Sequence, residues 1–228
     1  MIKLFGHETD GVIFDLDGTL LDSMWVWNKV DEDFLAENGI AVTSDYTEAV
    51  KQMHFNEAAL YTKNRYNLPQ STQQIKDRWI EMVEKEYAED IFLKPYAYEA
   101  LKTLLARGVK VGYATTLFGQ VARPCLKHNG IDSESLKEFC PLTTIEEVER
   151  GKGFPDIYQR AARKLSLEAN RCMVFEDIPL AIDGAMKGGF NFCGVYDKYS
   201  NAHLDFKSRC KNYIHDFDEL LIEIKKNV

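Results

Sequence analysis

Residues 12–23 read VIFDLDGTLLDS, and this segment is the strongest indication of the fold in the sequence. An apolar run, Val12 to Phe14, leads directly into two aspartates, Asp15 and Asp17, with one leucine between them. Such a run is typical of a short buried strand, and charged groups at its end are costly unless something compensates them. We therefore expect the rest of the chain to supply a partner for this pair of carboxylates.

The chain beyond this strand divides into an all-helical stretch and an alternating one. Three segments between residues 22 and 93 have helical periodicity: 22–38, 55–67 and 71–87. Asp22 or Ser23 is the expected N-cap of the first helix, and Ser71 or Thr72 that of the third. After Pro95, predicted helices alternate with predicted strands at 109–116, 141–144, 172–177 and 190–196.

Alternation of strands and helices predicts parallel pairing with right-handed crossovers. We therefore expect an α/β fold: a doubly wound parallel sheet, Rossmann-like, that is interrupted after its first strand by helices. The expected domains are the α/β core, residues 1–21 and 94–228, and an inserted all-helical domain, residues 22–93.

Polar side chains lie at the ends of several predicted strands. Asp15 and Asp17 end the first strand, Thr115 and Thr116 the second, and Glu176 and Asp177 a third, while Lys152 lies in a glycine-flanked loop before a helix. Open α/β sheets bind ligands beyond the carboxyl ends of their strands. The set therefore predicts an active site for a phosphate group and a divalent cation.

The residue types explain that prediction. Residues two apart on a strand face the same way, so Asp15 and Asp17 are expected to reach one small volume, with Asp177 from a neighbouring strand. Magnesium prefers carboxylate and carbonyl oxygens, and this metal is the partner expected for the aspartates. Lys152 and Thr115 offer a cation and a hydroxyl to phosphate oxygens, and Gly18 permits a tight turn with exposed N–H groups.

These motifs resemble the haloacid dehalogenase superfamily of phosphohydrolases, in the branch with a helical cap that includes β-phosphoglucomutase and many sugar-phosphate phosphatases. The four matching motifs are Asp15-Leu16-Asp17-Gly18-Thr19, Thr115, Gly151-Lys152-Gly153-Phe154-Pro155-Asp156 and Glu176-Asp177. They occur in the family's order and span nearly the whole chain. In two of them the sequence departs from the family pattern, since Gly153 replaces a usual proline and Ile178 a common serine.

The resemblance implies a role for each motif. Asp15 would be the nucleophile that forms an aspartyl-phosphate, and Asp17 the acid/base. Asp15, the carbonyl of Asp17 and Asp177 would hold Mg²⁺, with Glu176 direct or through water. The transferring phosphoryl group would be held by the following residues: Thr115, Thr116, Lys152 and Gly18.

Composition limits the partners. The formal net charge of −8 argues against nucleic acid or an anionic membrane as the main partner, and no apolar run reaches transmembrane length. Five scattered cysteines without a CxxC pair indicate reduced thiols. We expect a cytoplasmic monomer that acts on a small phosphorylated metabolite.

Two enzymatic readings stay open, a Mg²⁺-dependent phosphatase and a phosphomutase of the β-phosphoglucomutase kind. A mutase needs cations in the insertion for a second phosphate, whereas segment 49–59, where a substrate loop is expected, has one lysine and no arginine. This favours hydrolysis. A non-enzymatic phospho-aspartate receiver is a third reading, disfavoured because receivers lack a large helical insertion and the Asp-x-Asp-Gly-Thr motif. Each residue also has a plainer role: Asp17 as a turn residue, Lys152 as a solvated loop lysine and His54 as a surface histidine.

Overall fold

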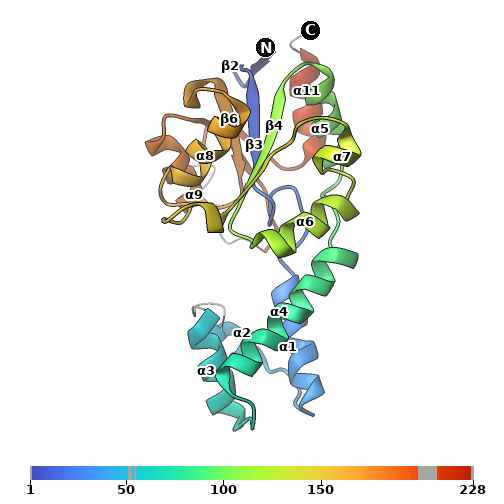
Figure 1. The fold of residues 1–228 in the computed structure, drawn as a ribbon, viewed down its shortest axis with the longest axis vertical. Coiled ribbons are helices and arrows are strands. Elements are labelled where there is room, and N and C mark those ends of the chain that lie inside the picture. Colours follow the sequence, from blue (N-terminus) through green and yellow to red (C-terminus); the bar gives the residue numbers. More distant parts are fainter. Residues whose placement is uncertain (1, 51–52, 54, 200–209, 227–228) are drawn as a thin grey trace. The chain divides into compact units, whose positions relative to one another are not determined.

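In the computed structural model, which describes residues 2–50, 53, 55–199 and 210–226, the apolar run is β3, Gly11–Phe14. It lies inside a sheet with strand order β5-β4-β3-β6-β7-β8, and each neighbouring pair of these strands is parallel. The other strands are β4 (Lys110–Thr115), β5 (Leu142–Thr144), β6 (Cys172–Glu176), β7 (Asn191–Val195) and β8 (Tyr213–Ile214). The predicted doubly wound α/β fold is confirmed (Figure 1).

Alternating side chains of β3 pack against helices on opposite faces of the sheet. Ile13 joins a buried cluster with Ile157 of α8 (Asp156–Leu165) and Ala181 of α9 (Pro179–Lys187). The ring of Phe14 lies 6.0 Å from that of Phe217, on α11 (Phe217–Lys226). Because both faces are covered, β3 is buried throughout and its sequence is continuously apolar.

The α/β part of the chain contains further elements, which connect the strands of the sheet. They are β1 (Ile2–Leu4), β2 (His7–Thr9), α5 (Ala97–Ala106), α6 (Gly119–His128), α7 (Ser133–Leu136) and two short 3₁₀ helices, Ile145–Glu147 and Ala169–Arg171. Strands β1 and β2 form an antiparallel hairpin outside the main sheet. The sequence reading predicted neither this hairpin, nor β8, nor α7, nor α11.

The chain divides into two compact units, Met1–Met24 with Ile91–Val228, and Trp25–Asp90. The second unit is helical and holds α1 (Val26–Glu37), α2 (Ser44–Val50), α3 (Phe55–Tyr66) and α4 (Thr72–Glu89). Trp79 is buried at its centre, with its ring 5.7 Å from the rings of both Phe34 and Phe55. His54 and residues 51–52 of the expected substrate loop lie outside the described residues.

The two N-cap predictions have different outcomes. Ser71 caps α4 as expected, because its hydroxyl accepts from the Gln74 N–H and the Gln74 side chain accepts from the Ser71 N–H. The cap predicted at Asp22 or Ser23 is wrong, since α1 begins at Val26 after Trp25 and has no side-chain cap. The Ser23 hydroxyl instead donates to the Asp17 carboxylate at 2.8 Å.

Candidate active site

The predicted site residues of three strands meet at one edge of the sheet. Asp15 follows β3, Thr115 is the last residue of β4, and Glu176 is the last residue of β6, with Asp177 directly after it. The Asp15 N–H donates to the Phe175 carbonyl at 3.1 Å, which continues the β3–β6 pairing beyond the strand end. Because β4, β3 and β6 are parallel neighbours, their carboxyl ends lie together.

Lys152 is buried between two of the acidic residues. Its Nζ forms ion pairs with Asp15 Oδ1 and, at 2.6 Å, with Glu176 Oε1, and its side chain is only 5% exposed. Burial acts to lower the pKa of Lys152, but Asp15 and then Glu176 outweigh burial and hold this pKa above its ordinary value. The ammonium therefore stays charged and is one partner of the carboxylate that follows the apolar strand.

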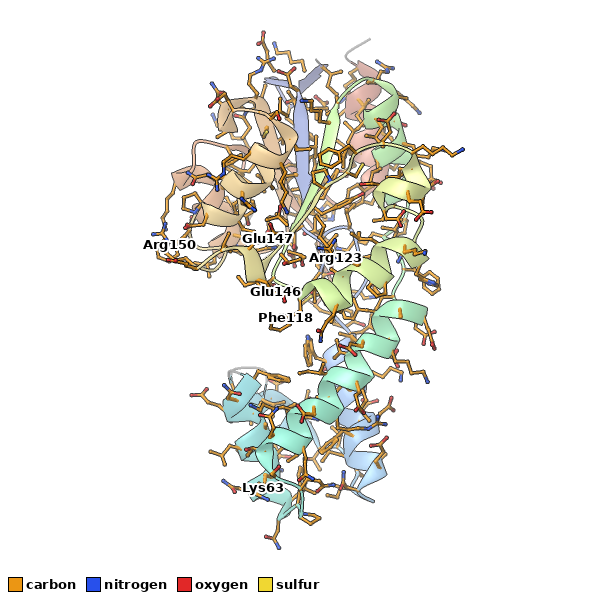
Figure 2. All side chains as sticks on the ribbon, in the orientation of Figure 1. Lys63, Phe118, Arg123, Glu146, Glu147 and Arg150 are labelled. Atoms are coloured by element: carbon orange, nitrogen blue, oxygen red, sulfur yellow. The ribbon has the colours of Figure 1, made fainter. Side chains whose placement is uncertain are left out.

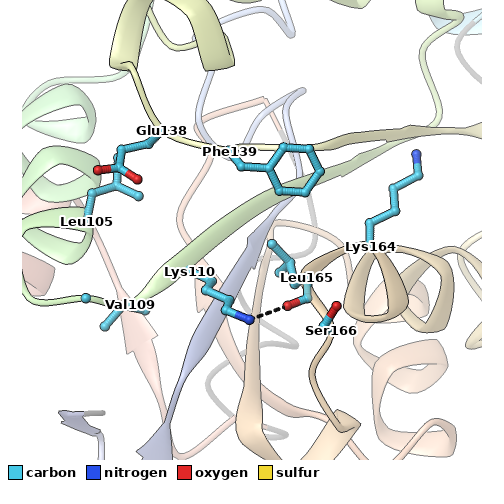
Figure 3. Close-up of a pocket in the computed structure, with 9 residues that line it drawn as sticks. Leu105, Val109, Lys110, Glu138, Phe139, Lys164, Leu165 and Ser166 are labelled. Carbon is cyan, nitrogen blue, oxygen red and sulfur yellow. Dashed lines mark hydrogen bonds between the residues drawn. The ribbon is translucent and has the colours of Figure 1, made fainter.

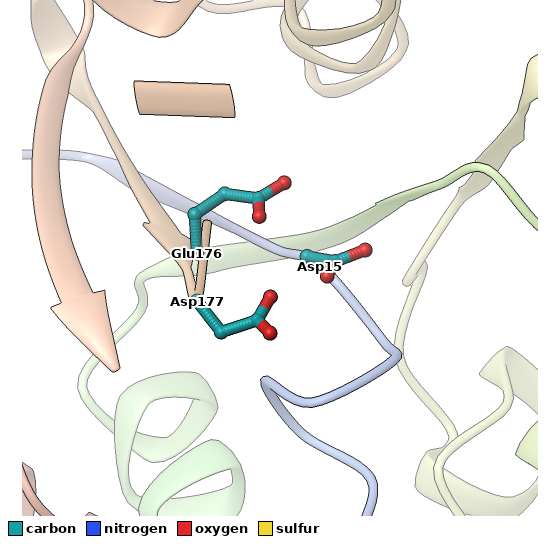
Figure 4. Close-up of side chains that lie close together, drawn as sticks. All are labelled: Asp15, Glu176 and Asp177. Carbon is teal, nitrogen blue, oxygen red and sulfur yellow. The ribbon is translucent and has the colours of Figure 1, made fainter. Parts of the chain in front are cut away.

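Three carboxylates form a cluster around the same point (Figure 4). Asp15, Glu176 and Asp177 are buried, and one oxygen of each lies within 4.8 Å of the others. Burial, and next the charge of Asp15, raise the pKa of Glu176 to about 7 and the pKa of Asp177 well above its ordinary value. The single positive charge of Lys152 is therefore insufficient to neutralise these three carboxylates.

The donor set fits a hard divalent cation. Among the described residues, Glu176 Oε2 is a buried oxygen without a hydrogen-bond partner, beside the two aspartates. Buried polar atoms are seldom left unpaired, and clustered carboxylate oxygens are the ligands that magnesium takes. The buried triad can therefore hold a metal ion.

The tight turn after Asp15 brings Thr19 into the cluster. The Thr19 hydroxyl lies 3.2 Å from Asp15 Oδ2 and 3.3 Å from Asp177 Oδ1, within donating distance of both. The turn needs glycine at position 18, where φ is +69° and an added Cβ would lie 2.4 Å from Asp177 Oδ2. Sequence reasoning placed Thr19 in the motif but gave it no role.

Asp17 has a different environment from Asp15. Its carboxylate accepts from the Ser23 hydroxyl and is not part of the three-carboxylate group. The strand ends at Phe14, so the two aspartates lie in the turn that follows it and not on one strand face. Asp15 is therefore paired with Lys152, whereas Asp17 is oriented by the Ser23 hydroxyl.

The two threonines at the carboxyl end of β4 differ in exposure. Thr115 is fully buried, and its hydroxyl accepts from the Leu117 N–H at 3.1 Å. Thr116 is exposed.

The start of the next helix, α6, is held by Glu146, whose carboxylate accepts from the Gly119 N–H at 2.8 Å. Figure 2 labels Glu146 and Phe118 near this end of the helix.

Tyr158 is a site residue that the sequence reading missed. It lies in α8, is fully buried, and donates its hydroxyl to Glu176 Oε1 at 2.8 Å. Glu176 Oε1 therefore accepts from both Lys152 and Tyr158. Its position two residues after Asp156 in the lysine motif is the only sequence signal, and it indicates a helix and not a contact.

The loop that carries Lys152 is fixed although Gly153 replaces the usual proline. The Arg150 guanidinium lies 4.4 Å from the centre of the Phe154 ring and forms a bidentate pair with Asp156. Lys187 of α9 donates to the Gly153 carbonyl at 2.9 Å. These contacts hold the backbone on both sides of Lys152.

A separate pocket of about 360 Å³ lies at the amino end of β4, away from the acidic cluster (Figure 3). Both lysines that line it are engaged within the protein, since Lys110 donates to the Leu165 carbonyl and Lys164 pairs with Glu147. All five cysteines are buried, and none of them is in a disulfide bond. Among the helices described, none is both long and apolar enough to cross a membrane.

Comparison with known proteins identifies the family. Residues 12–195 match the family of haloacid dehalogenase-like hydrolases, and the chain belongs to this family. The chain is 27% identical to hexitol phosphatase A of Escherichia coli over 187 residues, 81% of this chain and 82% of the relative. It is 24% identical to a phosphorylated carbohydrates phosphatase of Thermotoga maritima, over 79% of this chain and 82% of that protein.

Solved structures show the same fold. The crystal structure of a candidate β-phosphoglucomutase from Thermotoga maritima superposes with a TM-score of 0.85 at 21% identity, over 96% of this chain and 100% of that one. The resemblance inferred from the four sequence motifs is confirmed.

Proposed function

We propose that this hydrolase is a Mg²⁺-dependent phosphatase that acts through an aspartyl-phosphate on a small phosphorylated metabolite, such as a sugar phosphate. The observation that carries the proposal is the buried pairing of Asp15 with Lys152 within a metal-compatible cluster of three carboxylates, to which Asp15 itself belongs. Phosphoryl transfer needs little more than positioning and charge neutralisation, which this arrangement supplies.

The chemistry assigned to the chain's own residues has two steps. First, an Asp15 oxygen attacks phosphorus, the bond to the leaving oxygen breaks, and Asp17 gives that oxygen its proton. Second, Asp17 takes a proton from water, the water oxygen attacks phosphorus, and the Asp15–phosphorus bond breaks to release inorganic phosphate. The Ser23 hydroxyl orients Asp17 for both transfers.

The carboxylates of Asp15, Asp177 and Glu176, with the Asp17 carbonyl that the family pattern implies, would hold Mg²⁺. The bound ion would neutralise negative charge on the phosphoryl oxygens. Lys152 shares that work from the other side of Asp15, where its ammonium already lies. Thr115, Thr116 and Gly18 remain the proposed contacts for the phosphoryl oxygens.

Hydrolysis is favoured over phosphomutase activity by the cations of the helical unit. A mutase needs cations free for a second phosphate, but the described arginines and three of the lysines of this unit are engaged within it. The pairs are Lys29 with Asp33 and Glu86, Lys63 with the Leu68 and Gln70 carbonyls, Arg65 with Asp45, Lys76 with Asn56 and Arg78 with Glu37. Relatives named as sugar-phosphate phosphatases support the same choice.

A phosphate-release assay on a panel of phosphorylated metabolites tests the proposal. We expect Mg²⁺-dependent release from monophosphates, and loss of at least about 1,000-fold in Asp15→Asn, which lacks the attacking oxygen. Asp218→Asn, at an exposed position of α11, is the control and should behave as wild type. Near-normal turnover by Asp15→Asn would show that the assignment is wrong.

A second assay separates hydrolysis from isomerisation. β-Glucose 1-phosphate is supplied with a bisphosphate activator, and inorganic phosphate and glucose 6-phosphate are measured side by side. We expect phosphate release to exceed glucose 6-phosphate formation. The reverse result would replace the phosphatase proposal with the mutase.

A further inference from the structure

Lys94 is a largely buried cation that contacts the turn after Asp17, and the chemistry above gives it no role. It lies between α4 and α5, and its side chain is 11% exposed. Its Nζ donates to the carbonyl of Gly18 and, at 2.7 Å, to that of Tyr196, and pairs with Asp197 Oδ2 at 3.1 Å. An ammonium has three hydrogens, and these three acceptors account for them.

Asp197, the charged partner of Lys94, is also buried. Its side chain is 1% exposed, and its Oδ1 accepts from the Tyr199 N–H at 2.8 Å. A buried ion pair is weak evidence for stability alone, because desolvation offsets much of the attraction. Stability alone therefore does not account for the Lys94–Asp197 pair, and its position in the fold suggests another role.

Lys94 holds the catalytic turn at two points. Its side chain binds the Gly18 carbonyl, and its own N–H donates to the Leu20 carbonyl at 2.8 Å. The first contact fixes the residue directly after Asp17, at the left-handed glycine where the chain reverses. Because Gly18 is bonded directly to Asp17, a change of the Gly18 backbone would alter the direction of the Asp17 side chain.

We propose that Lys94, anchored by Asp197, is a positioning residue for proton transfer by Asp17. It holds the Gly18 carbonyl and so sets the direction of the Asp17 carboxyl without touching substrate. This inference rests on the proposed function, in which Asp17 protonates the leaving group. It predicts that loss of Lys94 lowers kcat/KM most for substrates whose leaving group needs that proton.

The test compares leaving groups. p-Nitrophenolate is weakly basic and departs without a proton, whereas the alkoxide of an alkyl phosphate such as glycerol 3-phosphate needs one. The value of kcat/KM, which reports events up to the first irreversible step, is measured for both substrates in wild type, Lys94→Met, Lys94→Arg and Asp197→Asn. Lys102→Met, at an exposed position of α5, is the matched control.

We expect Lys94→Met to lower kcat/KM for the alkyl phosphate roughly 10–100-fold, part of the general-acid contribution, and that for p-nitrophenyl phosphate at least about 10-fold less. Lys94→Arg should recover part of the difference, because it keeps the charge and donors. Asp197→Asn should show the same selectivity with a smaller loss. It also carries the test if circular dichroism shows that Lys94→Met is unfolded.

Equal losses for the two leaving groups, or no loss in Asp197→Asn, would overturn the positioning role while leaving the phosphatase proposal intact. Wild-type protein that releases no phosphate from either substrate would overturn the proposed function, and this inference with it.

Discussion

Thr19 connects two carboxylates that otherwise repel each other. Its hydroxyl is buried within hydrogen-bond distance of Asp15 and Asp177. A hydroxyl has one hydrogen, so it donates to one carboxylate at a time and keeps both close to the same point. The effect of the Thr19 hydroxyl can be measured apart from that of side-chain volume, because valine has the same shape as threonine without the oxygen.

We expect Thr19→Val to lose about 1–2 kcal/mol of unfolding free energy and to lower kcat about 10-fold, since it removes the donor and leaves two buried carboxylates less satisfied. Thr143→Val is the matched control, because the Thr143 hydroxyl is buried without a hydrogen-bond partner among the described residues. The control should be unchanged or more stable. Urea unfolding and phosphate release check both, and equal behaviour of the two variants would contradict the assignment.

The carboxylate cluster predicts a stability effect that does not depend on turnover. A cation that binds only the folded triad raises the melting temperature as its concentration rises. We expect wild type to melt higher in 10 mM Mg²⁺, on the order of a few degrees, and Asp177→Asn to show little or no rise. Asp218→Asn should respond as wild type does. A full response in Asp177→Asn would place the ion elsewhere.

Sequence reasoning found the residues whose type and position, at a strand end or in a glycine-flanked loop before a helix, are both informative. Asp15, Lys152, Glu176 and Asp177 were named from the sequence, and the structure brings them together. Tyr158 and Lys94 could not be found that way. One is on a helix and the other in a connecting segment, and only packing decides which buried oxygen each one reaches.

Helix α9 owes its position to a glycine. A Cβ at Gly184 would lie 1.9 Å from the Lys152 carbonyl and 2.9 Å from the Phe154 carbonyl, both of them backbone atoms that cannot rotate away. The helix therefore packs directly on the backbone of the lysine loop. This contact and the Lys187 bond to Gly153 join α9 to the loop.

We expect Gly184→Ala to push the lysine loop away from α9, at a cost of roughly 1–3 kcal/mol in unfolding free energy, and to lower kcat because Lys152 shifts from Asp15. Gly151→Ala, in the same loop, is the control, since a Cβ there meets nothing within 4 Å. Unfolding curves and steady-state kinetics report the two effects. An unaffected Gly184→Ala would show that this contact has no part in holding Lys152.

Most elements with strong periodicity or clear caps were predicted well, although helix α11 was missed, and most of the short ones were not predicted. The capped helix α4 and the alternating strands of the core were expected from the sequence. Helix α2 has only seven residues and strand β8 two, too few to show a period. The cap of α1 was misplaced because Ser23, a good capping residue, is bonded to Asp17 instead.

The helical unit contains a half-buried acid of its own, Asp31. Asp31 of α1 is half-buried and accepts from the Tyr46 hydroxyl at 3.1 Å, and the same hydroxyl lies 2.9 Å from that of Thr62. Burial raises the pKa of Asp31 to about 6, and the Tyr46 hydrogen bond only partly opposes this. This carboxyl lies in the unit Trp25–Asp90, so its titration reports on that unit.

The sign of the effect follows from proton counting. Between pH 4 and about 6 the folded protein keeps a proton on Asp31 that the unfolded chain has released. Stability from this group is therefore full below pH 4 and lost as pH rises through 6. A pKa of about 6 in the folded protein, against about 4 in the unfolded chain, corresponds to roughly 1–3 kcal/mol of unfolding free energy. Wild type lacks this contribution at pH 7 and above.

We expect Asp31→Asn to remove this dependence, because asparagine still accepts from Tyr46 but does not ionise. The variant should be more stable than wild type by roughly 1–3 kcal/mol at pH 8 and nearly equal to it at pH 4. All three tryptophans lie in the helical unit, so tryptophan fluorescence during urea unfolding follows that unit. Asp77→Asn, an exposed aspartate of α4, should leave the wild-type pH dependence in place. If Asp31→Asn loses stability between pH 4 and 8 as steeply as wild type does, another group is responsible and Asp31 is charged in the folded protein.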